Sequence, residues 1–368
     1  MKKQSIQFVC VVLFFGILLS AATYTGIGLI SGQDVESGGF FRVNGVLSAS
    51  ESIKTFRRNL DYSFFRRVDD ENVIIGKDQW LFEIQDPESG FDYLMDYVSG
   101  TPFTESQMRE IEWNLRTRMA EYAAKGVEYR LVVIPSTYTA CGEYLPDYLG
   151  DSAEATRLSV LSGYLSSRGV TSFMDLTEVM KDDGVAGVRY NNTEDSINAY
   201  GGYFLYDSVI SSLEGMDPAL SEHRLAFGEI EFATHYTNGR RIAQQIGLRK
   251  IITNYTVSLT NQLTERYSVN DATDHCVISR LNGGYGGSGL SVLIECSREW
   301  DKIQLTPYFS ATFCEVTYEN QLTDGALSVD AHMPDVYIQI IHEGELDMLL
   351  GQENSQFLQE NSNIPLVK

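Results

Sequence analysis

The sequence lacks the residue patterns that most often mark a metal or nucleotide site. Its five histidines form neither an HxH nor an HExxH pattern, and its five cysteines include no CxxC pair. Because zinc proteins usually show such spacings, the sequence supports no metal site. The glycine cluster over 282–289 carries no P-loop lysine, so nucleotide binding has no support either. We therefore expect no cofactor.

Positive charge is also scarce. The chain has 28 Lys and Arg against 50 Asp and Glu, for a formal net charge of -22. Such a chain repels phosphate, which argues against a nucleic-acid partner and against docking on anionic lipid. Hydrophobic residues make up 43% of the 368 residues, which is enough to build the core of one large α/β domain.

The N-terminus predicts a membrane anchor. Lys2 and Lys3 precede an apolar run over 6–30 that holds no charged residue. Roughly 20 residues cross a bilayer as a helix, so the run is long enough. The positive flank predicts that the body lies outside the cytoplasm. A cleaved signal peptide is the alternative, with small residues over 20–22 at the cleavage position, but the length of the run favours a retained anchor.

The remaining chain is expected to hold one large domain. After the anchor (1–31) come a Gly- and Ser-rich linker (32–50), the body (51–350) and a C-terminal tail (351–368). The patterns predict strands over 129–135, 170–176, 290–294 and 336–341, and helices over 51–70, 104–125, 153–168, 200–213 and 305–312. This alternation predicts an α/β fold with a parallel sheet. The stretch 214–289 breaks the alternation, so we interpret it as an insertion or variable region.

The body carries four of the five cysteines, Cys141, Cys276, Cys296 and Cys314. Outside the cell they have two alternative states, one or two disulfides or buried free thiols.

Several segments, in order, resemble the alginate O-acetyltransferase family of the AlgJ/AlgX type and its DHHW-motif relatives. They are VIIGKDQWLF (73–82), VVIP (132–135), EYLP (143–146), the block over 190–206, LIECS (293–297) and PDVYI (334–338). The resemblance implies an SGNH-hydrolase-like, flavodoxin-like sheet between helices. It also implies serine-dependent acetyl transfer to a cell-surface polysaccharide, with a membrane acyltransferase as a partner.

The implied active site departs from the family pattern. Ser297 stands at the nucleophile position, but Cys296 replaces the family Asp before it. In the Asp-x-His block, Glu194 takes the Asp position, and Asp195 and Ser196 take the next two, where the family has His-His or Thr-His. A serine is a poor nucleophile unless a base accepts its proton, so the resemblance predicts reduced or absent activity.

A second segment, Ala233-Thr234-His235, also resembles an Asp-x-His block, which makes His235 a candidate replacement base. The alternative is a surface histidine beside the turn at Asn238 and Gly239. Three functions are consistent with the sequence: a serine-dependent O-acetyltransferase or esterase, a pseudoenzyme that binds glycan or scaffolds an acetylation or export complex, and a structural surface protein.

Overall fold

The computed structural model describes residues 70–181, 187–260, 263–272, 276–319 and 325–351. The predicted anchor, linker, helix over 51–70 and C-terminal tail lie outside the described residues. Within them, no helix is both long enough and apolar enough to cross a bilayer.

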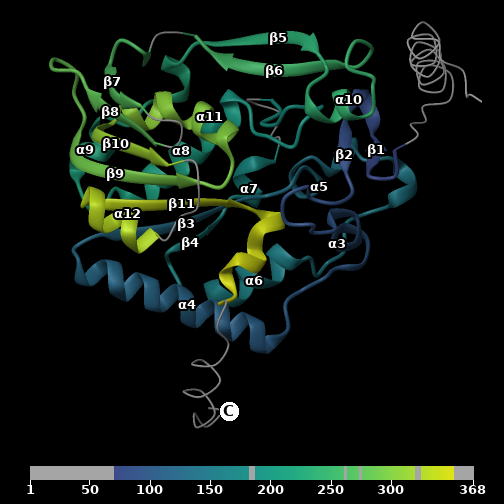
Figure 1. Cartoon of the computed structure of the whole chain (residues 1–368), viewed down its shortest axis with the longest axis horizontal. Coiled ribbons are helices and arrows are strands. Elements are labelled where there is room, and N and C mark those ends of the chain that lie inside the picture. The colour runs from purple at the N-terminus through teal and green to yellow at the C-terminus, as the bar shows by residue number, and fades with distance from the viewer. Residues whose placement is uncertain (1–69, 182–186, 261–262, 273–275, 320–324, 352–368) are drawn as a thin grey trace, which may run out of the picture. The chain divides into compact units, whose positions relative to one another are not determined.

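A seven-stranded sheet in the order β4-β3-β11-β9-β10-β8-β7 forms the centre of the body (Figure 1). Its strands are β3 (Glu128–Ile134), β4 (Phe173–Asp175), β7 (Tyr267–Ala272), β8 (Cys276–Leu281), β9 (Ser288–Cys296), β10 (Phe313–Glu319) and β11 (Val336–His342). Neighbours from β4 to β10 are parallel, whereas β8 and β7 are antiparallel. The α/β prediction is confirmed, but the sheet is mixed, because the stretch 214–289 contributes its two antiparallel strands.

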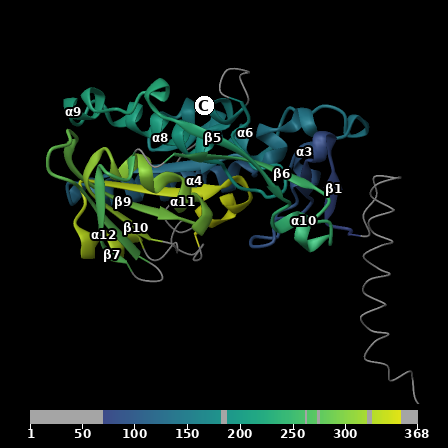
Figure 2. The same ribbon diagram turned by 90° about the horizontal axis from the view of Figure 1, so that it is seen from above.

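Helices cover both faces of the sheet. The helices of the described residues are α3 (Tyr93–Ser99), α4 (Glu105–Ala124), α5 (Thr137–Ala140), α6 (Arg157–Ser167), α7 (Thr177–Met180), α8 (Ala199–Leu213), α9 (Pro218–Glu222), α10 (Arg241–Gln245), α11 (Glu299–Ser310) and α12 (Gly325–His332). Of these, α10 packs against the β1–β2 hairpin and not against this sheet. Successive residues of β11 point to opposite faces. Ile340 therefore shares a core with Tyr206 of α8 and Phe309 of α11, while Ile341 shares one with Leu115 of α4. Figure 2 shows α8 and α12 on opposite sides of the strands.

The longest described helix shows how local sequence sets an element's ends. The Thr104 hydroxyl accepts the Gln107 N–H, and the Gln107 side chain accepts the Thr104 N–H, which together form a capping box. At the other end Gly126 has a φ of 78°, a conformation that favours glycine. The predicted helix over 104–125 is confirmed.

Two hairpins flank the sheet and are joined by one asparagine. They are β1 (Val73–Ile75) with β2 (Leu81–Glu83), and β5 (Phe232–Asn238) with β6 (Thr253–Leu259). The Asn192 carbonyl accepts the Leu81 N–H at 2.9 Å, and its side-chain oxygen accepts the Tyr255 N–H at 2.7 Å. Asn192 therefore links both hairpins to the block over 190–206.

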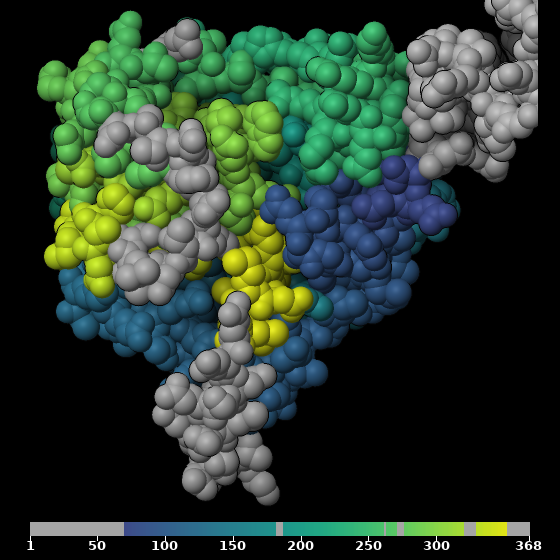
Figure 3. All heavy atoms as spheres, in the orientation of Figure 1, coloured from purple at the N-terminus to yellow at the C-terminus, as the bar shows by residue number. Residues whose placement is uncertain are grey.

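The C-terminal 3-10 helix η7 (Glu343–Leu349) follows β11. Figure 3 shows this yellow segment beside the blue region that contains β1 to α3. The contact is close, because a Cβ added to Gly344 would lie 2.6 Å from the Tyr93 hydroxyl oxygen.

Among the described residues, no disulfide joins Cys141, Cys276, Cys296 and Cys314 to one another.

Candidate active site remnant and adjacent cavity

Ser297 lies in the connection between β9 and α11. Its N–H donates to the Ile340 carbonyl of the neighbouring strand at 3.0 Å. Its hydroxyl oxygen is buried and has no hydrogen-bond partner among the described residues. The preceding Cys296 is fully buried, and burial raises the pKa of its thiol well above the usual value. In the described part of the chain, no base therefore makes a hydrogen bond to the predicted nucleophile.

The block that resembles the Asp-x-His motif is buried, and its side chains make structural hydrogen bonds and ion pairs. The Ser196 hydroxyl accepts the Asn191 side-chain N–H at 2.9 Å, and Glu194 pairs with Arg240 at 3.3 Å. The Asn198 side chain caps α8 by accepting the Gly201 N–H at 3.2 Å. None of these contacts reaches the Ser297 hydroxyl.

Asp195 contacts the site differently, through an ion pair with the residue after Ser297. The Arg298 guanidinium lies 3.2 Å from Asp195, 2.5 Å from Asp86 and 3.6 Å from Glu345. All four side chains are nearly buried, at 12% exposure or less. The Tyr93 hydroxyl also donates to Asp86 at 2.6 Å. Arg298 thus stands among three carboxylates from β2–α3, the 190–206 block and η7.

This network shifts the titration of its acids. Burial alone would raise the pKa of Asp86, but the charge of Arg298 and the Tyr93 hydrogen bond outweigh it and lower that pKa to about 2. One guanidinium thus holds Asp86 ionised, and with Asp195 and Glu345 it links three segments that are distant in the chain. Sequence reasoning missed Arg298, although an arginine after the serine and an acid at a histidine position are visible in the sequence.

A histidine does lie near this edge of the sheet. His342 ends β11, and its Nε2 lies 2.6 Å from the Asp301 carboxylate of α11, with both side chains almost fully buried. Burial and the charge of Arg298 lower the pKa of His342, but the Asp301 carboxylate outweighs them and the net shift is upward. The Nε2 atom pairs with Asp301, and the Ser297 hydroxyl has no hydrogen-bond partner among the described residues, so no hydrogen bond joins this histidine to that hydroxyl.

The structure does not bring His235 to Ser297. His235 lies on β5, opposite Thr256 of β6, and its side chain is exposed. Its Nε2 lies 2.8 Å from the Ser258 hydroxyl. His235 resembles the motif histidine in sequence, but it lies on the β5–β6 hairpin and contacts Ser258.

A buried acid follows His342. The Glu343 carboxylate accepts the Ser136 N–H at 2.7 Å and the Thr139 hydroxyl at 2.8 Å. Burial raises the pKa of Glu343 to about 7, although both hydrogen bonds oppose the shift. The sequence does not indicate this contact, because Glu343 and the loop after β3 are about 200 residues apart in the chain.

A cavity of about 890 Å³ opens beside Glu194. Its lining residues are Glu194, Thr237, Asn238, Gly239, Arg240, Arg241, Gln244, Gln245, Arg249 and Trp300. Trp300 is 51% exposed, and the Arg240 guanidinium lies 6.0 Å from the centre of its ring. Arginines and an aromatic ring thus gather in one place on a strongly acidic chain.

The three arginines of the cavity differ in the ion pairs that they form. Arg241 makes a two-pronged pair with Glu83 at 2.6 and 2.5 Å, and Arg240 pairs with Glu194. The Arg249 side chain has no ion pair with any described residue and is exposed. Counting the described residues alone, the cavity therefore has positive charge that no carboxylate pairs with, beside an aromatic face.

Comparisons with known proteins place the fold. No family model matches the chain, and no curated protein matches it. Among solved structures, Bacillus cereus PatB1 with a sulfonyl adduct is 11% identical with a TM-score of 0.52, covering 76% of this chain and 97% of that chain. A DHHW family protein from Eubacterium siraeum is 10% identical with a TM-score of 0.50, covering 80% and 97%. The O-acetyltransferase domain of Pseudomonas putida AlgJ is 14% identical with a TM-score of 0.48, covering 78% and 98%.

The likeness to PatB1 and to the DHHW family protein shows that the chain has their fold. The predicted α/β fold, with the architecture of the DHHW-motif relatives, is confirmed at this level. Among the described residues, no base contacts the Ser297 hydroxyl on this fold.

Proposed function

We propose that this chain is a non-catalytic SGNH-like protein that binds an anionic cell-surface polysaccharide. The observation that carries the proposal is the cavity lined by Arg240, Arg241, Arg249 and Trp300. The Ser297 hydroxyl, which has no hydrogen-bond partner among the described residues, supports a non-catalytic role. The sequence resemblance to alginate O-acetyltransferases supports a polysaccharide as the ligand. The N-terminal apolar run supports a position outside the cytoplasm, tethered to the membrane.

The chemistry of the cavity favours an acidic sugar. The exposed face of Trp300 offers an apolar surface on which a sugar ring stacks. A guanidinium donates two parallel N–H bonds to a carboxylate, and Arg249 is available for this contact. Since the whole chain has a net charge of -22, a local excess of arginine is needed for an anionic ligand to approach.

In this proposal the chain acts as a binding subunit of an acetylation or export complex. It holds the polysaccharide near a membrane acyltransferase that supplies the acetyl chemistry. A Ser297 that contacts no base is consistent with this role, because binding needs the fold and the cavity but no activated nucleophile.

The test is calorimetric titration of the full-length chain in detergent with a polyuronate oligosaccharide and with a neutral oligosaccharide of equal length. We expect the polyuronate to bind and the affinity to fall as ionic strength rises. Arg249→Gln is expected to weaken binding about tenfold or more, since a charge-assisted hydrogen bond contributes about 1.5–3 kcal/mol. Trp300→Ala is also expected to weaken binding, because the sugar ring loses its stacking surface.

The matched control is Lys181→Gln. Lys181 lines a separate cavity of about 740 Å³ with Glu143, Glu154, Asp175 and Glu178, so its loss is expected to leave polyuronate binding unchanged. Equal binding of the neutral and acidic oligosaccharides, or full binding by both cavity variants, would contradict the proposal.

A second candidate function is serine-dependent ester chemistry that uses His342 as the base. The observation that favours it is the buried His342–Asp301 pair on β11 and α11, the two elements that adjoin Ser297. It requires His342 to leave Asp301 or to accept a proton through its other nitrogen. A Ser297-dependent acetyl esterase rate that His342→Gln abolishes would support it.

A further inference from the structure

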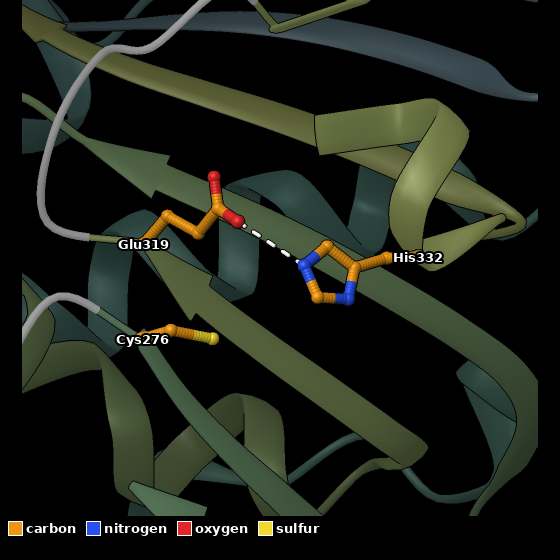
Figure 4. A group of neighbouring side chains, drawn as sticks. All are labelled: Cys276, Glu319 and His332. Carbon is orange, nitrogen blue, oxygen red and sulfur yellow. Dashed lines mark hydrogen bonds and ion pairs between the residues drawn. The ribbon is translucent and has the colours of Figure 1, made fainter. Parts of the chain in front are cut away.

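Three metal-binding side chains that line neither described cavity meet where β8, β10 and α12 come together. Cys276 begins β8 and Glu319 ends β10, and the two residues stand directly opposite each other in the antiparallel pair. Opposite residues of a sheet project from the same face. His332, the last residue of α12, places its Nε2 atom 3.1 Å from the Glu319 carboxylate. Figure 4 shows all three side chains directed toward a common point.

The spacing of the three groups suits a small ion. One ligand atom of each side chain lies within 4.8 Å of the others. In a tetrahedral zinc site, bonds of about 2.3 Å to sulfur and 2.1 Å to nitrogen or oxygen hold neighbouring ligands about 3.5 Å apart. Rotamer adjustments of roughly 1 Å would close the site. The side chains of His332 and Glu319 are 25% and 16% exposed, so an ion can enter but is partly shielded.

We propose that Cys276, Glu319 and His332 bind a zinc ion, with water as the fourth ligand. A thiolate is a soft ligand that disfavours Mg²⁺ and Ca²⁺, whereas thiolate, imidazole and carboxylate together suit Zn²⁺. The bound ion ties the end of α12 to two strands of the sheet. The ligands come from three separate elements, which explains why no short sequence spacing signals the site. The proposal does not depend on the proposed function.

The first test is titration of the reduced full-length chain with Co²⁺, a spectroscopic substitute for Zn²⁺. We expect one Co²⁺ per chain and a thiolate-to-cobalt absorption band that zinc displaces. Outer-shell changes at zinc sites weaken metal binding 10- to 100-fold, so His332→Ala should weaken it by at least about 100-fold. Cys276→Ser should abolish the band.

Matched controls separate this site from adventitious binding. Cys314 is an exposed cysteine of β10, and His235 is exposed on the β5–β6 hairpin, so Cys314→Ser and His235→Ala should leave Co²⁺ binding unchanged. The proposal is overturned if the wild type shows no thiolate-to-cobalt absorption band, or if Cys276→Ser retains that band.

A second test needs no variant and therefore does not depend on how the variants fold. The wild-type chain is alkylated with iodoacetamide with and without zinc, and each cysteine is followed by mass spectrometry. We expect zinc to protect Cys276 at least about tenfold while Cys314 reacts at the same rate in both samples, because only a metal-bound thiolate is withdrawn from reaction. Equal rates at Cys276 with and without zinc would count against the site.

Discussion

The guanidinium of Arg298 lies 3.2 Å from the carboxylate of Asp195, 103 residues earlier in the chain. The pair joins the residue after Ser297 to a residue at a histidine position of the family that the sequence resembles. Where that family is expected to activate a serine, this chain has an ion pair, which also includes Asp86 and Glu345. These ion pairs hold together segments that are distant in the chain.

Replacing Arg298 with methionine should destabilise the fold strongly. The substitution leaves three buried carboxylates without their cation, and breaking a buried ion pair costs about 3–5 kcal/mol. Urea unfolding followed by circular dichroism measures the change. The matched control is Arg280→Met, since Arg280 pairs with Glu315 on the exposed surface and its loss should cost at most about 1 kcal/mol. Equal losses for both variants would show that the network contributes little.

Glu343 should make stability fall as the pH rises through neutrality. Its pKa is raised from 4.5 to about 7 in the folded chain, so the folded state binds its proton more tightly than the unfolded state does. The contribution is therefore complete below pH 4.5 and is lost as the pH rises to about 7. At 1.36 kcal/mol per pKa unit, the loss is about 3 kcal/mol. The raised pKa of His342 acts in the same direction.

The variant Glu343→Gln isolates this contribution, because glutamine keeps an acceptor for Ser136 or Thr139 but does not titrate in this range. Unfolding free energies measured from pH 4.5 to 8 should fall less steeply for the variant than for the wild type. The lowered pKa of Asp86 acts only below about pH 4, where stability should fall as the pH drops toward 2. Parallel pH profiles for the two chains would refute the assignment to Glu343.

Replacing Ser297 with alanine should leave stability unchanged or raise it by up to about 1 kcal/mol. Its buried hydroxyl has no partner among the described residues, and an unpaired buried hydroxyl is itself unfavourable. Ser196→Ala is the informative comparison, because it removes an acceptor from Asn191 and should cost about 1 kcal/mol. A clear loss of stability in Ser297→Ala would reveal a contact that the present account lacks.

The parts of the fold that follow from local pattern were predictable from the sequence. The apolar run that forms β3, with Leu131 to Ile134 fully buried, marked a central parallel strand, and Thr104 and Gly126 marked the ends of α4. The antiparallel strands β7 and β8 were missed because only one of the six residues of β8 is fully buried. A half-exposed edge strand has no continuous apolar run to distinguish it from a loop.

The assignment of Ser297, Glu194 and Ser196 to a catalytic site stays a prediction. The contacts of these residues are set by distant segments of the chain, which the motif order does not indicate. His235 imitates the motif, yet the register of β5 against β6 keeps it beside Ser258. The network around Arg298 joins segments that no local sequence pattern connects, so it becomes visible only in the folded structure.

Acetate release from an O-acetylated polyuronate, at a concentration that saturates binding, distinguishes a binding protein from a serine-dependent esterase. Full-length wild type and Ser297→Ala are compared under the same conditions. The account predicts saturable binding by both chains and equal acetate release, at the level of the buffer alone. Acetate release that depends on Ser297 would contradict it, and would show that His342 or another group activates the serine.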